Sequence, residues 1–334
     1  MDEAQKLFDS KYTGLQIEEA IAAGLELRSD PQLALANLGG RPNRNLVKNW
    51  YFAGGGSQLG FGIFPINQRG KTEYTQDFGS AYGPDGWVLE GRSSLALKST
   101  HMEFSTTGNA ITQPETKEFL SNLVGKQVTI SCLTLDNELA TATGIVNDFS
   151  QSTGIQAAFS GGSFAFAVFP DVAVQVLRWA GTGKIVACKV EEGPVQTLAY
   201  KDSSGIWKLF ETPNYVEELA CCHNYLIELN KQRYQIPTFC IAVKGSQWYA
   251  QIPIPSTMRT FPAIQITGGD IYIEANGQSA KVLSMTPHTA VAGIAMFVLN
   301  LETPLPDGTQ SGVLYVLGSE SGDNAPRIFL SAEL

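Results

Sequence analysis

The stretch SFAFAVFPDVAVQVLRW, residues 163–179, decides the fold class of this chain. It is rich in β-branched and aromatic residues, which favour strands over helices. Gly161-Gly162 marks a turn immediately before it. The sequence therefore predicts two neighbouring strands, Ser163–Phe169 and Val172–Trp179.

Strands of the same kind are predicted on both sides of this stretch, separated by turns such as Pro84-Asp85-Gly86. They cover Leu46–Phe52, Trp87–Glu90, Ser94–Lys98, Val128–Leu135, Val195–Tyr200, Ile206–Phe210, Tyr234–Val243, Trp248–Ile252, Ala263–Ile266, Asp270–Glu274, Lys281–Met285, Ala292–Leu301, Val313–Leu317 and Arg327–Ser331. One helix is predicted from Thr212-Pro213 to about Leu229. We expect a mainly β protein, with a jelly-roll β-sandwich over 45–200, a linking hairpin and helix over 201–233, and a second β-sandwich, the head, over 234–334.

The first 44 residues carry a different pattern, with capping signals at Thr13 and at Ser29-Asp30-Pro31. Apolar residues then recur at helical spacing, which predicts two short helices. Isolated helices this short are marginal in water. We therefore expect residues 1–44 to form an attachment segment that associates with copies of itself.

The composition excludes several classes of partner. Charged residues make up 16% of the 334 residues, and the formal net charge is −9. An acidic chain without a run of Lys and Arg is repelled by phosphate backbones, so we expect no nucleic-acid partner. The sequence also holds no apolar run of membrane-spanning length, and its first ten residues, MDEAQKLFDS, do not match an export signal.

The five cysteines and three histidines show no ligand spacing. The cysteines stand mostly among apolar residues, which predicts reduced core thiols. We expect no metal and no cofactor. The cysteines are Cys132, Cys188, Cys221, Cys222 and Cys240, and the histidines are His101, His223 and His288.

Catalytic motifs are likewise missing from the sequence. The glycine-rich segment 54–62 lacks the Lys-Ser/Thr of a phosphate-binding loop, and no Gly-x-Ser-x-Gly elbow occurs. Paired carboxylates for glycoside hydrolysis would have to come from acids such as Asp85, Glu90 and Glu103, which the sequence does not bring together. The sequence predicts no catalytic residue and no enzyme.

Sugar binding without chemistry needs aromatic faces and nearby polar side chains. The head offers such a set, and its candidate carbohydrate-binding residues are Gln247, Trp248, Tyr249, Arg259 and Tyr272. The competing interpretation of each aromatic residue is ordinary packing within a strand.

Several different short motifs follow one another along the chain. They are Phe8–Ile21 with its Tyr12-Thr13-Gly14; Asn45-Leu46 and Asn49–Phe52, followed by Asn67-Gln68-Arg69-Gly70 and Tyr82–Trp87; Gln196–Tyr200, followed by Trp207 and Pro213–Glu218; and Pro253–Pro262. In this order, over nearly the whole chain, they resemble tail-fibre and receptor-binding proteins encoded by phages and prophages of Gram-positive bacteria.

The resemblance implies a homotrimer with a carbohydrate-binding-like sandwich, located in a virion tail. The N-terminal helices would join three chains and attach them to other tail or baseplate proteins, and the head would meet a host cell-surface polysaccharide. Such a protein would be made in the bacterial cytoplasm and released by lysis. Three alternatives remain: a tail-associated polysaccharide depolymerase, a structural baseplate connector without host contact, and a secreted lectin, which the lack of an export signal disfavours.

Overall fold

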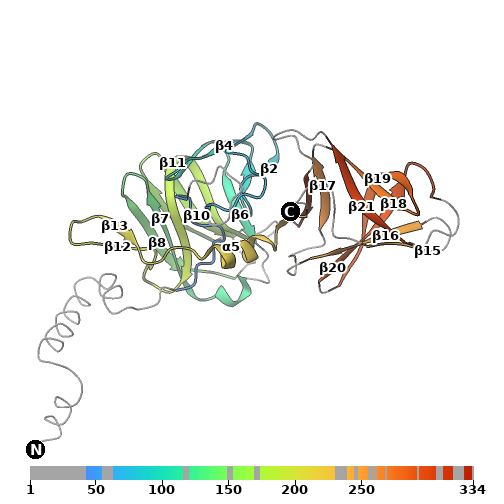
Figure 1. Ribbon diagram of the computed structural model, residues 1–334. Coiled ribbons are helices and arrows are strands. Elements are labelled where there is room, and N and C mark those ends of the chain that lie inside the picture. The colour runs from blue at the N-terminus through green and yellow to red at the C-terminus, as the bar shows by residue number, and fades with distance from the viewer. Residues whose placement is uncertain are drawn as a thin grey trace, which may run out of the picture. The chain divides into compact units, whose positions relative to one another are not determined.

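A computed structural model describes residues 43–54, 63–115, 120–148, 153–168, 174–229, 239–243, 247–254, 258, 262–267, 269–291, 293–305, 311–318 and 327–332. The chain is mainly β, as the sequence predicts, and it forms two compact units (Figure 1). The sandwich unit comprises Met1–Ser57, Thr72–Ala81 and Trp87–Pro213, and the barrel unit comprises Gln58–Lys71, Tyr82–Gly86 and Asn214–Leu334. The two short helices predicted from the capping signals at Thr13 and at Ser29-Asp30-Pro31 lie outside the described residues.

The sandwich unit contains thirteen of the described strands and one short 3₁₀ helix. The strands are β1 (Glu73–Gln76), β2 (Ser80–Tyr82), β3 (Val88–Glu90), β4 (Arg92–Leu97), β5 (Met102–Thr107), β6 (Ile111–Glu115), β7 (Gln127–Thr134), β8 (Leu139–Ile145), β9 (Thr153–Phe159), β10 (Gly162–Val168), β11 (Val174–Glu192), β12 (Ala199–Lys201) and β13 (Trp207–Leu209), and the 3₁₀ helix is Ser121–Leu123. Six of these strands were not predicted from the sequence, because they are short or carry many polar residues: β1, β2, β5, β6, β8 and β9.

The long strand β11 belongs to both sheets of the sandwich. Its first half pairs with β10 and β6, and its second half pairs with β5 and β7. The change of partners occurs around Gly181, whose φ is +88°. A Cβ atom there would lie 2.6 Å from the carbonyl oxygen of Gly161. Glycine therefore lets one strand continue from one sheet into the other, which explains why the strand predicted at 172–179 is much longer in the structure.

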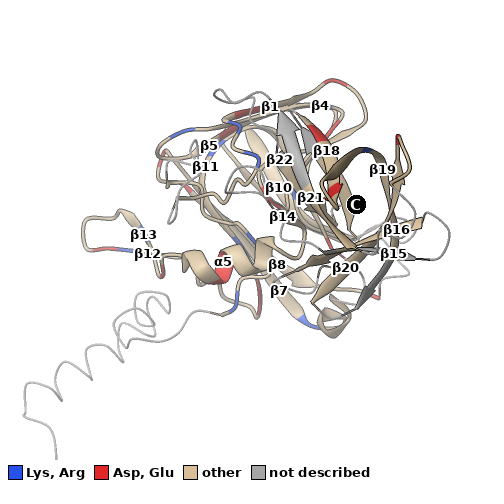
Figure 2. Cartoon of the chain, turned by 45° about the vertical axis from the view of Figure 1, so that its right-hand side comes forward, with Lys and Arg blue, Asp and Glu red and all other residues tan. Residues whose placement is uncertain are grey.

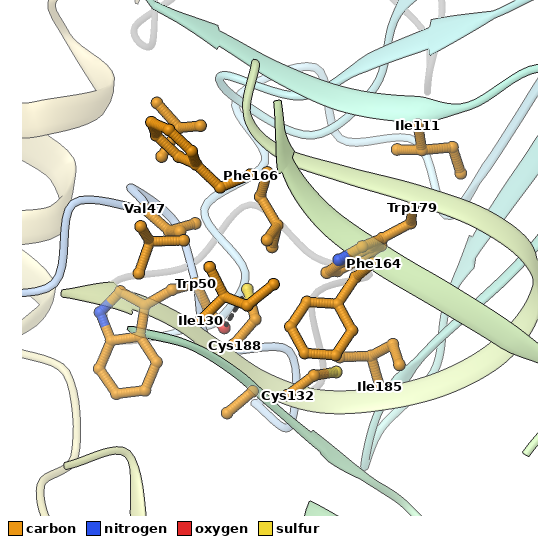
Figure 3. Packing of buried hydrophobic residues seen from close by; sticks show 14 of the residues in the cluster. Val47, Trp50, Ile111, Ile130, Cys132, Phe164, Phe166, Trp179, Ile185 and Cys188 are labelled. Atoms are coloured by element: carbon orange, nitrogen blue, oxygen red, sulfur yellow. Dashed lines mark hydrogen bonds between the residues drawn. The ribbon is translucent and has the colours of Figure 1, made fainter. Parts of the chain in front are cut away.

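Large aromatic rings fill the space between the two sheets. Trp87 and Trp179 are fully buried, with ring centroids 4.8 Å apart, and Phe52 packs edge-on against Trp179 at 5.5 Å. Figure 3 shows Phe164, Ile130, Ile185 and other buried residues around Trp179. Fully burying side chains of this size contributes roughly 2–3 kcal/mol each before conformational entropy is counted. This core is the main stabilising feature of the sandwich unit.

The strand predicted at Leu46–Phe52 is wrong in detail. This segment runs beside β11 and forms one isolated bridge, between Tyr51 and Ala187, together with the backbone hydrogen bonds Leu46 N to Val190 O and Phe52 N to Val186 O. Asn49 interrupts regular pairing because its φ is +54°. The segment is therefore an irregular edge whose apolar residues still enter the core.

The barrel unit contains the head strands predicted from the sequence, and six of them close into a barrel in the order β15-β16-β20-β19-β18-β21. Their bounds are β15 (Phe239–Val243), β16 (Gln247–Pro253), β18 (Gly269–Ala275), β19 (Gln278–Val291), β20 (Ile294–Leu301) and β21 (Ser311–Gly318). Closure removes the exposed edges that an open sheet of this size would have. A separate sheet in the order β14-β22-β17 packs into the same core, with β14 (Leu226–Glu228), β17 (Ala263–Thr267) and β22 (Arg327–Ser331).

The helix predicted to reach about Leu229 is too long. The helix α5 spans only Tyr215–Cys222, with the Asn214 side chain accepting a hydrogen bond from Val216 N as its N-cap. The following residues Leu226 and Ile227 are buried in β14, which pairs with β22. Their apolar spacing fits either a helix or a buried strand, and pairing with a distant strand decides between the two.

Candidate functional site

The polar residues in the stretches behind the family resemblance hold the fold together. Asn45 accepts hydrogen bonds from Val47 N (3.0 Å) and Val190 N (3.1 Å) and donates to Cys188 O (3.0 Å). Its side chain therefore fastens the irregular edge segment to β11. This residue has a structural role and is not a ligand site.

Gln68 and Asp85, from two of these stretches, pair inside the barrel unit. The Asp85 carboxylate, fully buried, accepts hydrogen bonds from Gln68 N (2.9 Å) and Gln68 Nε2 (2.6 Å). The Gln68 side chain also donates to Leu226 O (2.8 Å) and accepts from Glu228 N (3.1 Å), so it binds the edge of β14. Buried polar groups of this kind are costly unless paired, and here they specify how segments distant in sequence meet.

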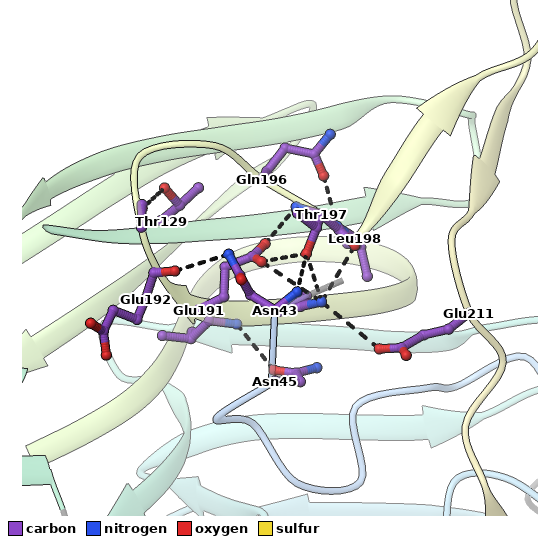
Figure 4. A network of polar contacts seen from close by, with 12 residues as sticks. Asn43, Asn45, Thr129, Glu191, Glu192, Gln196, Thr197, Leu198 and Glu211 are labelled. Atoms are coloured by element: carbon purple, nitrogen blue, oxygen red, sulfur yellow. Dashed lines mark hydrogen bonds and ion pairs between the residues drawn. The ribbon is translucent and has the colours of Figure 1, made fainter. Parts of the chain in front are cut away.

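A second buried network surrounds Glu191 and Thr197 (Figure 4), and it includes the buried Lys189. Lys189 Nζ donates to Thr197 Oγ1 (2.9 Å) and lies 3.7 Å from Glu191 Oε2. Glu191 in turn accepts hydrogen bonds from the backbone N (2.6 Å) and the hydroxyl of Thr197. Burial lowers the pKa of the Lys189 amine and raises the pKa of the Glu191 carboxyl. The network fixes the loop around Thr197 onto the end of β11.

The head candidates are not gathered at one place. Trp248 is 3% exposed and belongs to the barrel core, whereas Gln247 is exposed and Tyr249 is half-buried on the outer face of β16. Tyr272 is half-buried on β18, which is three strands from β16 in either direction around the barrel. Arg259 lies outside the described residues. Tyr249 instead packs against His288, with ring centroids 5.0 Å apart.

The three carboxylates considered for glycoside hydrolysis also have separate partners. Asp85 is held by Gln68, as described above. Glu103 on β5 contacts His101 Nε2 at 3.1 Å, and this hydrogen bond lowers the pKa of the Glu103 carboxyl. Glu90, at the end of β3, accepts hydrogen bonds from Gln175 Nε2 (3.3 Å) and Thr112 Oγ1 (3.4 Å). The structure therefore does not make a catalytic set of these three.

A pocket of about 580 Å³ opens at one end of the sandwich, and we call it the turn pocket. It lies where three connections cross between the two sheets: β1 to β2, β3 to β4 and β5 to β6. Its lining residues are Asp77, Phe78, Gly79, Ser80, Glu90, Gly91, Arg92, Thr107 and Asn109. Small-molecule sites commonly have volumes of roughly 300–1,000 Å³, and this pocket falls in that range.

The turn pocket combines one aromatic ring with several polar groups. Phe78, at the tip of the β1–β2 turn, is 91% exposed. Within the described part of the chain, the side chains of Asp77 and Arg92 form no ion pair or hydrogen bond, so both are available to a ligand. Sequence reasoning missed Asp77 and Phe78 because they occupy a turn between two strands, β1 and β2, that it did not predict. It missed Arg92 because nothing in the sequence brings the start of β4 next to that turn. The one available signal was an aromatic residue in a turn, Asp77-Phe78-Gly79.

Backbone contacts between the connections define the shape of the turn pocket. Gly91 N donates to Gly79 O at 2.7 Å, which ties the β3–β4 turn to the β1–β2 turn. Gly91 has a φ of +58°, and a Cβ atom there would lie 2.0 Å from Asn109 Nδ2. The absence of a side chain at Gly91 therefore lets Asn109 reach across the pocket wall.

Charged residues are sparse, and among the described residues their positions along the chain are dispersed over both units (Figure 2). Among the residues that the structure describes, no three His, Cys, Asp or Glu side chains gather as metal ligands would. In the same residues, no helix is both long and apolar enough to cross a bilayer. Four of the five cysteines are buried and Cys221 is half-buried, all as free thiols.

Comparison with known proteins gives no relative: no protein-family model, no curated protein and no solved structure matches this chain.

Proposed function

We propose that this chain is a tail fibre or receptor-binding protein of a phage or phage-tail-like particle, and that it binds a bacterial surface glycan without chemistry. The observation that carries the proposal is the turn pocket, where the exposed ring of Phe78 stands beside unengaged polar groups. Sugars present apolar C–H faces and hydroxyl groups, and aromatic and polar side chains bind these two features respectively. The ordered stretches that resemble tail proteins support the tail assignment.

A shallow pocket for a sugar gives weak binding when it acts alone. Three linked copies raise avidity through effective concentration, so a millimolar site is sufficient to hold a particle on a cell. The proposal therefore includes a homotrimer. Light scattering of the purified full chain at micromolar concentration should give the trimer mass, and a monomer would contradict this half of the proposal.

The direct test is binding of fluorescently labelled full chain to a panel of Gram-positive strains, before and after their surface polysaccharides are removed. We expect strain-selective binding that disappears on removal. A labelled unrelated protein of similar size and charge is the control for non-specific adhesion. Absence of binding to every strain would favour a baseplate connector instead.

One observation favours a second candidate, the tail-associated polysaccharide depolymerase. Asp77 and Glu90 both line the turn pocket, and glycoside hydrolysis uses two carboxyl groups on either side of one bond. A reducing-sugar assay on polysaccharide from a bound strain separates the two functions. Release of reducing ends by the native chain, lost in both Asp77→Asn and Glu90→Gln, would establish the enzyme and overturn binding without chemistry.

A further inference from the structure

The charge and aromatic content of the turn pocket restrict the kind of glycan that it fits. We infer that the turn pocket binds an uncharged pyranose residue stacked on Phe78, and that this sandwich site, not the head, supplies the main glycan contact. The inference rests on the proposed function and names its site and ligand class.

Phe78 provides the apolar surface. The residue is 91% exposed, the largest value among the exposed large hydrophobic residues that the structure describes. The residue stands between Asp77 and Gly79 at a turn tip, so it contributes nothing to the sandwich core. A ring left in water at the wall of a polar pocket gains free energy when an apolar sugar face covers it.

The polar side chains around the ring match vicinal hydroxyl groups. Asp77 offers carboxylate acceptors, and Arg92 offers donors in a planar fork, without competing partners among the described residues. Ser80, Thr107 and Asn109, all exposed, add hydroxyl and amide groups to the pocket lining. A pyranose presents neighbouring hydroxyls that both donate and accept, so it satisfies a mixed set of this kind.

The formal charge of the pocket disfavours anionic ligands. Asp77 and Glu90 contribute two negative charges against the single positive charge of Arg92, and the whole chain carries −9. A phosphate or uronate group would meet a net repulsive field in addition to losing its hydration. The pocket therefore favours neutral hexoses or N-acetylhexosamines over phosphate polymers and acidic sugars.

The head lacks a comparable arrangement in its described residues. Trp248 is buried in the barrel, Tyr249 is half-buried and packs edge-on against His288, and Tyr272 lies on a distant strand. The sandwich unit instead presents its aromatic and polar groups on three connections, two of which are joined by the Gly91–Gly79 hydrogen bond. A site with its shape already set loses less entropy on binding.

The test uses a glycan microarray that carries neutral hexose, N-acetylhexosamine and uronic-acid oligosaccharides, with polyglycerol phosphate as the anionic polymer. The native full chain should bind one of the neutral classes. Phe78→Ala should weaken that binding roughly tenfold, the scale of one lost aromatic contact. Arg92→Gln should weaken it as well. Ile145→Ala, which removes an exposed side chain (60% exposed) from β8 of the same unit, is the matched control.

Failure of this inference can be distinguished from failure of the proposed function. If Tyr249→Ala abolishes binding while Phe78→Ala leaves it intact, the glycan site is in the head and the inference is overturned, whereas the proposed function stands. Binding to the anionic polymer alone would overturn the ligand class. If the native chain binds no strain in the cell assay and no glycan on the array, both fail. Circular dichroism of each variant checks that the loss is not unfolding.

Discussion

Replacing Lys189 with methionine tests whether the buried Lys189–Glu191 network stabilises the sandwich unit. Methionine keeps most of the apolar stem but removes the charge, and it leaves Glu191 without its cation. The side chains of Lys189 and Glu191 are 2% and 0% exposed, and their charged atoms lie 3.7 Å apart. At an effective dielectric constant of about 20, two charges separated by 3.7 Å interact by about 4.5 kcal/mol. Breaking a buried pair typically costs about 3–5 kcal/mol, so we expect Lys189→Met to lower the free energy of unfolding by about that amount near neutral pH.

The decrease in the free energy of unfolding caused by Lys189→Met should depend on pH. Burial already raises the pKa of the Glu191 carboxyl, and Lys189 opposes this effect, so its removal raises that pKa further. An acid with a raised pKa in the folded state contributes stability below its unfolded pKa and loses it as pH rises through the folded pKa. The difference between variant and native chain should therefore be smaller at about pH 5 than at about pH 7.5, because Glu191 becomes protonated in the variant.

Urea unfolding followed by tryptophan fluorescence measures this effect, because Trp50, Trp87, Trp179 and Trp207 all belong to the sandwich unit. Lys126→Met is the matched control. Lys126 Nζ lies 2.9 Å from Glu192 Oε1, but the two side chains are 44% and 50% exposed. An exposed pair contributes less than about 1 kcal/mol. The reasoning would be refuted if Lys189→Met lowered the free energy of unfolding no more than Lys126→Met does. It would also be refuted if the decrease for Lys189→Met were the same at both pH values.

Three further predictions concern the fold. Gly181→Ala should lower the melting temperature more than Gly108→Ala. Both residues have positive φ, but only at Gly181 would the new methyl group meet a backbone oxygen, at 2.6 Å. Equal decreases in melting temperature would contradict a steric requirement for glycine where β11 passes from one sheet to the other. Asp85→Ala should destabilise the barrel unit by about 1–3 kcal/mol in urea unfolding, because two donors of Gln68 lose their buried acceptor; Asp202→Ala, at an exposed turn, is the control. A chromogenic thiol reagent should label Cys221 alone in the native chain, since burial raises the pKa of Cys240 to about 12 and raises that of Cys132 as well; rapid labelling of a second thiol would contradict this.

The sequence by itself determined the fold class and the positions of the most apolar strands. Segments such as 163–168 and 294–301 are rich in β-branched and aromatic residues, and local propensity and burial agree there. Polar strands such as β8 (LATATGI) carry little apolar signal, and only their pairing with β7 makes them strands. Residues 226–228 show the same limit, because an apolar run fits a helix or a strand until a partner such as β22 is present.

Tertiary structure alone decided the candidate site. Phe78, Arg92 and Asn109 are separated in sequence, and each stands in or beside a turn that looks unremarkable by itself. They meet because three connections cross between the sheets at one end of the sandwich, which depends on the long-range pairing of β1, β4 and β5. The aromatic residues that the sequence suggested for sugar binding depend on tertiary structure in the same way. Alternation along β16 turns Trp248 into the barrel and Tyr249 out of it. A side chain's identity is local information, whereas its exposure and its neighbours are set by strands that are distant in the chain.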